Sequence, residues 1–232
     1  MNLFYQPEIT NGIFHLDTDE SKHCIKVLRR RAGDEINLVD GRGCFYTARI
    51  TSANPKRCEF EITAKTEDTP RNFHVHIAIA PTKNIDRIEW FVEKATEIGI
   101  DEISLIVSHK SERKVIKSER LEKKAIAAMK QSLKARLPKI NKPTGFTDFI
   151  SIEKTNNKFI AQVDPENPGL LGKTASPGTR CCVLIGPEGD FTDSEVNAAI
   201  ENKWIKVSLG NSRLRTETAG LVACHILNLI NE

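Results

Sequence analysis

Two successive strand–loop–helix patterns near the end of the chain constrain its fold more than any other feature. The first has an apolar run at residues 181–185, a loop at 186–191 and then a helical pattern. The second has a strand-like run at 205–209, a polar loop and a helical pattern after Thr216. Ligands of open α/β sheets bind at the carboxyl ends of the strands. The two loops therefore predict a ligand site at that edge of an α/β domain.

The helices after these loops have recognisable starts. Thr192 and Glu195 have the spacing of a capping box, which predicts a helix start there. Thr216 is the expected N-cap of the last helix. Because that helix is apolar nearly all round, we expect it deep in the protein.

The loops also limit the kind of ligand. They lack the glycine spacings typical of dinucleotide-binding and triphosphate-binding loops. Backbone amides and apolar side chains would line a pocket between them. Such a lining favours a neutral or mildly charged ligand.

The alternation of strands and helices extends back to about residue 73, which predicts a domain at 73–232 with a mainly parallel sheet. Its further predicted strands are 75–79, 103–107 and 159–161, and its further predicted helices are 85–98 and 118–135. The Pro- and Gly-rich stretch at 165–178 predicts a surface loop.

Residues 1–70 have the pattern of a separate, β-rich domain. Runs at 35–39 and 44–50 flank Asp40-Gly41-Arg42-Gly43, a strong hairpin signal, and 57–64 alternates again. Short strands joined by tight turns predict a small barrel. The polar stretch at 67–72 is the best candidate for a linker.

Composition indicates an ordinary soluble protein, with 39% hydrophobic and 28% charged residues. No apolar run approaches the length that spans a bilayer, and no secretory signal is indicated, so we expect no membrane association. The six cysteines include no C-x-x-C pair, which predicts reduced thiols in a cytoplasmic protein.

Metal binding is not indicated by the histidines or the cysteines. His74 and His76 form a His-x-His pair, but no ligand cluster accompanies them, so partly buried imidazoles are the favoured interpretation. Cys181 and Cys182 are adjacent in a strand and point to opposite faces. We therefore expect no metal.

Positive charge is concentrated in two stretches. Lys22–Arg31 contains five Lys or Arg and no acidic residue, and 110–142 is also strongly basic, although the net charge is only +3. Such clusters suit a nucleic-acid backbone. A solvated helical face is the alternative, and charge alone leaves both interpretations open for the second cluster.

Several motifs resemble one known family. Leu184-Ile185-Gly186-Pro187-Glu188-Gly189, Leu209-Gly210 and Leu214–Ala219 are similar to the cofactor site of the knotted SPOUT methyltransferases. Within that superfamily the chain resembles the RsmE-type 16S ribosomal RNA uridine-3 methyltransferases. Matches near His23 and at Lys94–Gly99 extend the resemblance over almost the whole chain.

The resemblance implies a fold and an activity. The fold is an N-terminal PUA-like, RNA-binding β-barrel followed by an α/β domain with a trefoil knot. The activity is methylation of ring nitrogen 3 of a uridine in 16S ribosomal RNA of the small ribosomal subunit, with S-adenosyl-L-methionine as cofactor. Relatives pair through the knotted domain, so a homodimer is also expected.

The expected site residues follow from the motifs and the chemistry. Removing the proton from uracil nitrogen 3 needs a base, or a cation that stabilises the uracil anion. Arg215 is the expected cation and Glu217 the candidate base, although a carboxylate in a helix's first turn also has a purely structural explanation. The expected cofactor-binding residues are Leu184, Ile185, Gly186, Pro187, Glu188, Gly189, Leu209, Gly210, Leu214, Thr216, Thr218 and Ala219. The expected RNA-binding residues are Lys22, Lys26, Arg29, Arg30, Arg31 and Arg213.

The chain departs from the family pattern at two places. Asp190 stands where the family usually has Gly, and Ser212-Arg213 stands where it has Arg and an aliphatic residue. Three alternatives are a non-catalytic RNA-binding or ribosome-assembly protein, a SPOUT methyltransferase with a different RNA target, and an α/β enzyme acting on a small metabolite. The intact motif at Leu214–Ala219 argues against the first, and the two basic clusters argue against the third.

Overall fold

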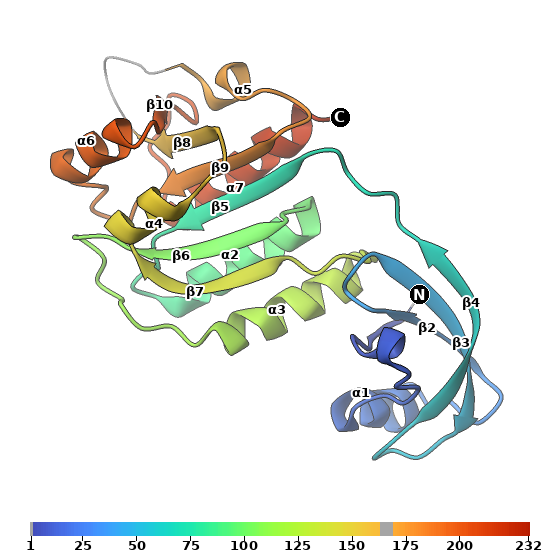
Figure 1. The fold of residues 1–232 in the computed structure, drawn as a ribbon. Coiled ribbons are helices and arrows are strands. Elements are labelled where there is room, and N and C mark those ends of the chain that lie inside the picture. Colours follow the sequence, from blue (N-terminus) through green and yellow to red (C-terminus); the bar gives the residue numbers. More distant parts are fainter. Residues whose placement is uncertain (1, 163–168) are drawn as a thin grey trace. The chain divides into compact units, whose positions relative to one another are not determined.

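The computed structural model describes residues 2–162 and 169–232 (Figure 1). It divides into two compact units. One contains Met1–Pro70 together with Ile126–Leu137, and the other contains Arg71–Ala125 and Pro138–Glu232. The predicted loop at 165–178 lies partly outside the described residues, and α5 (Leu171–Thr174) occupies part of the remainder.

The first unit is built on a four-stranded sheet. Its strands, in spatial order, are β1 (Leu3–Tyr5), β2 (Glu35–Val39), β3 (Cys44–Ser52) and β4 (Glu59–Glu67). The pair β1–β2 is parallel and the other two pairs are antiparallel. The predicted hairpin is confirmed. Its turn is held by the Asp40 carboxylate, which accepts hydrogen bonds from the backbone amides of Arg42 (2.7 Å) and Cys44 (3.1 Å).

Short helices precede β2 in this unit: η1 (Ile9–Asn11), α1 (Thr18–Lys22) and the π-type segment η2 (His23–Val27). The side chain of Asp17 caps α1 by accepting a hydrogen bond from the Glu20 amide (2.8 Å). Cys24 and Leu16 are buried and join the apolar cluster that covers the sheet. Because Cys24 lies within the basic stretch Lys22–Arg31, its burial attaches that stretch to the sheet.

The end of α3 (Ser118–Gln131) belongs to the first unit and differs from the prediction, which continued the helix to Ala135. Leu133 has a left-handed backbone, with φ +55°, which ends the helical conformation. Met129 and Ala135 then pack against Leu3 and Val39. No glycine marks the end of α3. Packing of the residues around Leu133 sets it instead, so the sequence pattern missed where the helix ends.

The second unit contains a six-stranded sheet in which every described strand pair is parallel. Its strands are β5 (His74–Ile79), β6 (Glu102–Val107), β7 (Lys139–Gly145), β8 (Asn157–Ala161), β9 (Arg180–Ile185) and β10 (Ile205–Val207). Their spatial order is β10-β8-β9-β5-β6-β7. The prediction of an α/β domain with a mainly parallel sheet is confirmed.

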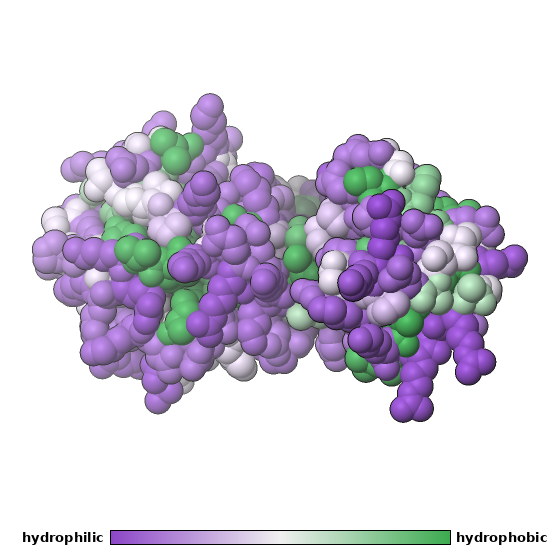
Figure 2. All heavy atoms as spheres, turned by 90° about the horizontal axis from the view of Figure 1, so that it is seen from below, coloured by the Kyte–Doolittle hydropathy of each residue, from purple (hydrophilic) through white to green (hydrophobic). Residues whose placement is uncertain are grey.

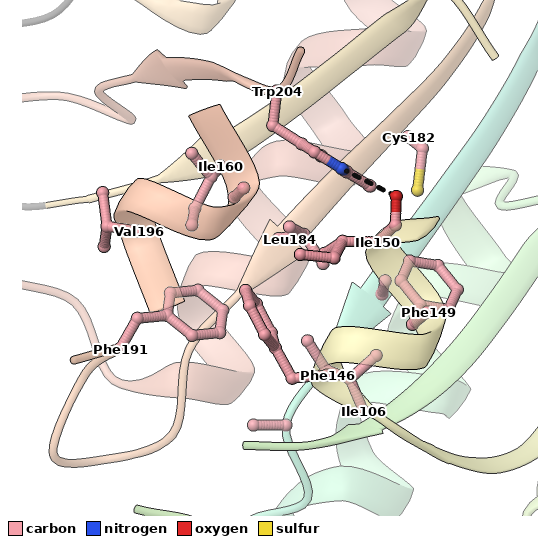
Figure 3. Close-up of a cluster of buried hydrophobic side chains, with 13 residues drawn as sticks. Ile106, Phe146, Phe149, Ile150, Ile160, Cys182, Leu184, Phe191, Val196 and Trp204 are labelled. Carbon is pink, nitrogen blue, oxygen red and sulfur yellow. Dashed lines mark hydrogen bonds between the residues drawn. The ribbon is translucent and has the colours of Figure 1, made fainter. Parts of the chain in front are cut away.

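Helices cover both faces of this sheet. α2 (Ile85–Ile98) and α7 (Thr216–Leu229) pack on each other on one face, whereas α4 (Phe146–Ile152) and α6 (Asp193–Glu201) lie on the other (Figure 1). The predicted capping box is confirmed: at the start of α6 the Glu195 amide donates to the Thr192 hydroxyl (3.2 Å), and the Thr192 amide donates to the Glu195 carboxylate (2.9 Å). Phe146, Phe149, Phe191 and Trp204 fill the core beneath α4 and α6 (Figure 3).

α7 differs from its prediction in two ways. Arg215, with extended backbone, is the N-cap, and Thr216 is the first helical residue. The expectation that the whole helix lies deep in the protein is wrong for the single chain. Gly220 touches the core so closely that a Cβ there would lie 2.8 Å from the Phe91 ring, whereas Leu229 is 54% exposed. The apolar residues away from the core face are only partly covered.

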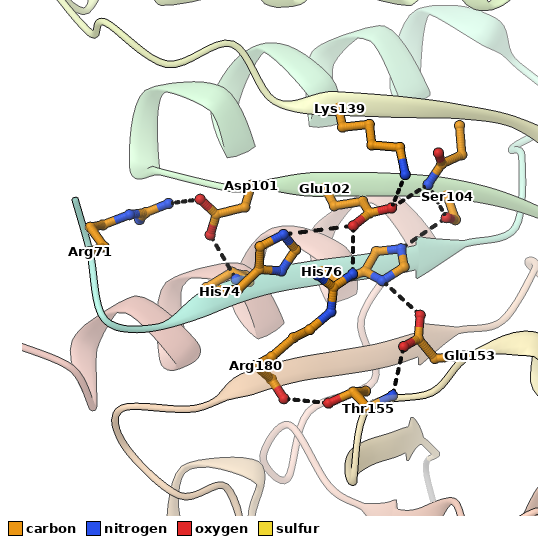
Figure 4. Close-up of polar contacts among 12 residues, drawn as sticks. Arg71, His74, His76, Asp101, Glu102, Ser104, Lys139, Glu153, Thr155 and Arg180 are labelled. Atoms are coloured by element: carbon orange, nitrogen blue, oxygen red, sulfur yellow. Dashed lines mark hydrogen bonds and ion pairs between the residues drawn. The ribbon is translucent and has the colours of Figure 1, made fainter. Parts of the chain in front are cut away.

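A polar network occupies the amino ends of the central strands (Figure 4). The buried Glu102 carboxylate accepts hydrogen bonds from Arg180 (2.7 Å), Lys139 (3.0 Å) and Asn141 (2.7 Å). Burial opposes ionisation of Glu102, but the Asn141 and Lys139 donors and the nearby His76 outweigh it and lower its pKa to about 2. The network anchors the sheet edge opposite the predicted ligand site.

Hydrophilic side chains cover most of the surface seen in Figure 2, with scattered apolar patches. Among the described residues, no helix combines the length and the apolar character needed to cross a membrane.

Candidate functional site

A cavity of about 330 Å³ lies at the end of β8 and between the loops after β9 and β10. All three strands are parallel, so their carboxyl ends lie at the same edge of the sheet. The lining residues are Ala161, Gln162, Ile185, Gly186, Pro187, Glu188, Asp190, Leu209, Gly210, Ser212, Arg213, Leu214, Thr216 and Ala219. The two sequence loops therefore meet where the strand–loop–helix patterns predicted.

The loop after β9 is a tight turn around an acidic side chain. The Asp190 amide donates to the Pro187 carbonyl (2.9 Å), and Asp190 has a left-handed φ of +57°. Its Oδ1 accepts a hydrogen bond from the Phe191 amide (2.7 Å). A Cβ on Gly186 would lie 2.9 Å from that same oxygen. Glycine at 186 therefore leaves the room that the Asp190 carboxylate occupies.

The loop after β10 uses glycine for a different reason. Gly210 has φ +126°, a conformation that other residues rarely adopt, but a Cβ there would meet nothing within 4 Å. The Ser208 hydroxyl accepts from the Gly210 amide (3.2 Å) and donates to its carbonyl (3.0 Å). Backbone conformation, and not lack of space, makes glycine the suitable residue at 210.

Nine of the residues expected to bind cofactor line the cavity: Ile185, Gly186, Pro187, Glu188, Leu209, Gly210, Leu214, Thr216 and Ala219. The other three lie outside that lining. Leu184 points into the core beneath α4 and α6 (Figure 3), and Gly189 faces the Lys110 side chain. Thr218 is half-buried in the first turn of α7.

Sequence reasoning did not assign four lining residues, Ala161, Gln162, Asp190 and Ser212. Ala161 is the last residue of β8 and Gln162 follows it, and β8 lies between β9 and β10 in the sheet. Strand order cannot be read from periodicity, so no signal pointed to these two. Asp190 and Ser212 stood out in the sequence only as departures from the family pattern.

The two candidate catalytic residues lie beside the cavity and not in its lining. Arg215 is exposed at the N-cap of α7. Glu217 is buried, and its Oε1 lies 3.8 Å from Nε of Arg87 on α2. Its other oxygen is buried without a hydrogen-bond partner among the described residues. The Glu217 carboxylate therefore faces Arg87 on α2.

A basic segment braces the loop after β9. Lys110 donates to the Gly189 carbonyl (2.8 Å), and Arg113 donates to the Lys83 carbonyl (2.8 Å). The Lys83 amide in turn donates to the Glu188 carboxylate (3.1 Å). Part of the second basic cluster thus holds the wall of the cavity, and Arg213 contributes a further cation to its lining.

The first basic cluster lies on the surface of the first unit. Lys22, Lys26, Arg29, Arg30 and Arg31 are all exposed, in α1, η2 and the turn that follows. Arg29 has a left-handed φ of +56°, which turns the chain at the centre of the cluster. These side chains are available to an anionic partner.

One group of possible metal ligands occurs in the described part of the chain. Ligand atoms of His76, Glu153 and Cys182 lie within 4.8 Å of one another. Nδ1 of His76 lies 3.2 Å from Glu153, and its Nε2 lies 2.8 Å from the Ser104 hydroxyl (Figure 4). Burial raises the pKa of the Cys182 thiol well above its ordinary value, which makes it a poor metal ligand. Pairing of imidazole with carboxylate accounts for this group.

Comparison with known protein families agrees with this architecture. Residues 69–228 match the family model described as an RNA methyltransferase domain, and residues 16–63 match an RNA methyltransferase PUA domain. The crystal structure of a probable rRNA-methyltransferase from Porphyromonas gingivalis shares 44% identity with this chain. That similarity covers 100% of this chain and 98% of that one, with a TM-score of 0.93.

Two further relatives are also similar over nearly their full length. The ribosomal RNA small subunit methyltransferase E of Aquifex aeolicus is 28% identical, covering 98% of this chain and 99% of that protein. The crystal structure of the Neisseria gonorrhoeae enzyme of the same name, bound to S-adenosyl methionine, is 29% identical with a TM-score of 0.86, covering 100% and 98% of the two chains. The chain belongs to the RNA methyltransferase family.

Proposed function

We propose that this protein transfers a methyl group from S-adenosyl-L-methionine to ring nitrogen 3 of a uridine in 16S ribosomal RNA of the small ribosomal subunit. One observation carries the proposal: the two motif loops meet in a single cavity at the carboxyl ends of β8, β9 and β10. The small-subunit methyltransferases named above support the substrate.

The cavity suits this cofactor in size and character. Its volume of about 330 Å³ is within the range of small-molecule sites. Leu209, Leu214 and Ala219 supply apolar walls, and the open space beside Gly210 lets its backbone approach a ligand closely. Glu188 and Asp190 add negative charge, which suits a ligand with cationic centres. When bound, the cofactor supplies an electrophilic methyl group.

The protein's own contribution is to position the uridine and to remove the proton from its ring nitrogen. Arg215 is the proposed cation that stabilises the developing uracil anion, because it is exposed next to the cavity. Arg213 adds positive charge in the lining. Glu217 is the proposed base. Its contact with Arg87 supports the structural alternative, and the Gln variant described in the Discussion separates the two.

We propose that residues 1–70 form a PUA-like barrel that grips RNA through Lys22, Lys26, Arg29, Arg30 and Arg31. Residues 73–232 form the catalytic domain, with α7 passing through a trefoil knot. The exposure of the basic cluster and the match to a PUA domain support the first part. The match of residues 69–228 to an RNA methyltransferase domain supports the second.

A homodimer in the cytoplasm completes the proposal. Leu170, Leu171, Ile226, Leu229 and Ile230 surround an apolar hollow between α5, α7 and the loop after β10. A second copy of the chain would cover this surface, and symmetric pairing is the commonest way to do so. No disulfide joins the six cysteines, all of which lie in the part of the chain that the structure describes, and this fits a reducing compartment. A monomeric mass by light scattering at micromolar concentration would contradict the dimer.

Methylation of defined substrates tests the reaction. The purified protein would be incubated with labelled S-adenosylmethionine and either unmodified 16S ribosomal RNA or small subunits that lack the modification. We expect N3-methyluridine as the labelled nucleoside after digestion. Label in another nucleoside would indicate a different RNA target, and cofactor binding without transfer to any RNA would favour a non-catalytic role.

A further inference from the structure

One charged side chain in the cavity is not explained by the structure of its loop alone. Asp190 lies in the lining, only partly exposed, with a left-handed φ of +57°. Its Oδ1 accepts the Phe191 amide at 2.7 Å, a contact that an asparagine side chain could make equally well. The turn therefore does not require the negative charge of Asp190.

Burial and the groups around Asp190 act on its carboxyl in opposite directions. Burial is the largest effect and raises the pKa of Asp190 above its ordinary value, while the Phe191 amide and the cations of Lys110 and Arg213 favour the charged form and oppose it in part. Arg213 lines the same cavity, and Lys110 is held nearby by its hydrogen bond to the Gly189 carbonyl (2.8 Å). Glu188, the other acidic residue of the lining, is exposed, and its carboxylate already accepts the Lys83 amide.

The ligands of the proposed reaction differ in charge at one atom. The methyl donor carries a positive sulfonium, an ammonium and a carboxylate, for a net charge of +1. The product S-adenosylhomocysteine keeps the ammonium and the carboxylate but has a neutral thioether, for a net charge of zero. A fixed carboxylate in the wall therefore favours the donor over the product by Coulomb attraction.

We propose that Asp190 makes the cavity discriminate between the cationic methyl donor and its neutral product. This inference rests on the proposed function and concerns the same site. The carboxylate held over Gly186 stabilises the bound donor and weakens retention of the product. Asp190 is thus a specificity-determining residue of the cofactor site, and its charge, not its shape, matters.

Calorimetric binding to the full-length protein tests this directly. Dissociation constants for S-adenosylmethionine, S-adenosylhomocysteine and sinefungin, whose amine replaces the sulfonium with another cation, would be measured for wild type and variants. Asp190→Asn removes the charge and keeps the acceptor for the Phe191 amide. Asp190→Gly suits the left-handed backbone and provides a second variant. Asp193→Asn is the matched control, because Asp193 is an exposed carboxylate on the same segment outside the lining.

In both Asp190 variants, the preference for donor over product should fall by roughly three- to tenfold, as loss of one partly screened charge predicts. Sinefungin should follow the donor, and Asp193→Asn should keep the wild-type ratio. A ratio within twofold of wild type, or equal weakening of donor and product, would overturn the inference while leaving the proposed function intact. If wild-type protein bound neither ligand, the proposed function itself would fail, and this inference with it.

Discussion

At the scale of single residues, two glycines in the cavity have different physical reasons to be glycine. Gly186 is required by space, since a Cβ there would collide with the Asp190 carboxylate and the Phe191 amide. Gly210 is required by its backbone, since its φ of +126° is unsuited to other residues although the surrounding space is open. Substitutions at the two positions should therefore fail in different ways.

Gly210→Val should lower affinity for S-adenosylmethionine by at least about tenfold while the fold persists, because forcing φ toward an ordinary value costs roughly 1–3 kcal/mol and shifts the loop. Gly12→Val is the matched control. Gly12 also has a positive φ (+80°) with nothing within 4 Å of a Cβ, but it belongs to the first unit. Calorimetry should show lost binding only for the Gly210 variant. Unchanged affinity in folded Gly210→Val would place the cofactor elsewhere.

Arg215→Ala should lower turnover by about a hundredfold or more and leave cofactor affinity within about twofold, if the guanidinium stabilises charge only during the reaction. Single-turnover methylation and calorimetry together measure this. Parallel loss of binding and turnover would instead make Arg215 part of the pocket's framework.

Glu217→Gln tests the proposed base by the same two measurements. If Glu217 is the base, the variant should lose most of its turnover while its melting temperature stays close to that of wild type. Near-normal turnover combined with a lower melting temperature would remove Glu217 from the mechanism and leave it as the partner of Arg87, whose Nε lies 3.8 Å away.

At the scale of helices and strands, elements with a sustained apolar pattern were predictable, whereas polar or very short elements were not. The strands β5, β6 and β9 and the helix α2 lie where the pattern placed them. The strand β7 was missed because it is polar and sits at the sheet's edge, and α4 was missed because it is only one or two turns long. Pairing with β6 creates β7, and a local pattern does not contain that information.

The network around Glu102 predicts how stability depends on pH. Its pKa in the fold is about 2, lowered from an ordinary value of 4.5, so its contribution is present above pH 4.5 and is lost as pH falls toward 2. Glu102→Gln should cost about 2–3 kcal/mol at neutral pH, and the deficit relative to wild type should shrink below pH 4.5.

Denaturant titrations between pH 7 and pH 3 measure this difference. Glu97→Gln is the control, since its carboxylate pairs with Lys94 near the surface (2.9 Å) and should contribute within about 1 kcal/mol. A Glu102→Gln deficit that stayed constant down to pH 3 would show that lost packing, and not lost charge, destabilises the variant.

At the scale of the whole molecule, the predicted family was confirmed by both family models and by the relative at 44% identity. Periodicity alone gave the α/β class and the edge of the sheet that holds the site. It could not give the sheet order β10-β8-β9-β5-β6-β7, which places Ala161 and Gln162 in the cavity. The knot and the dimer stay predictions from the resemblance.

Division of labour between the units is testable through salt dependence. Replacing Arg29, Arg30 and Arg31 with alanine should weaken RNA binding for all sequences. It should also flatten the salt dependence of binding, because each lost phosphate contact removes roughly 0.7–0.9 from the slope of log affinity against log salt. Cofactor affinity should not change. Weaker methylation with an unchanged slope would indicate damage to the first unit, and unchanged affinity and slope would make the cluster a solvated surface.

The most direct test of the central claim is nucleoside mass spectrometry of 16S ribosomal RNA from a strain that lacks this protein. The proposed function predicts loss of N3-methyluridine from one position, restored by the wild-type gene and not by the Arg215→Ala variant. An unchanged set of modified uridines in the deletion strain would contradict it.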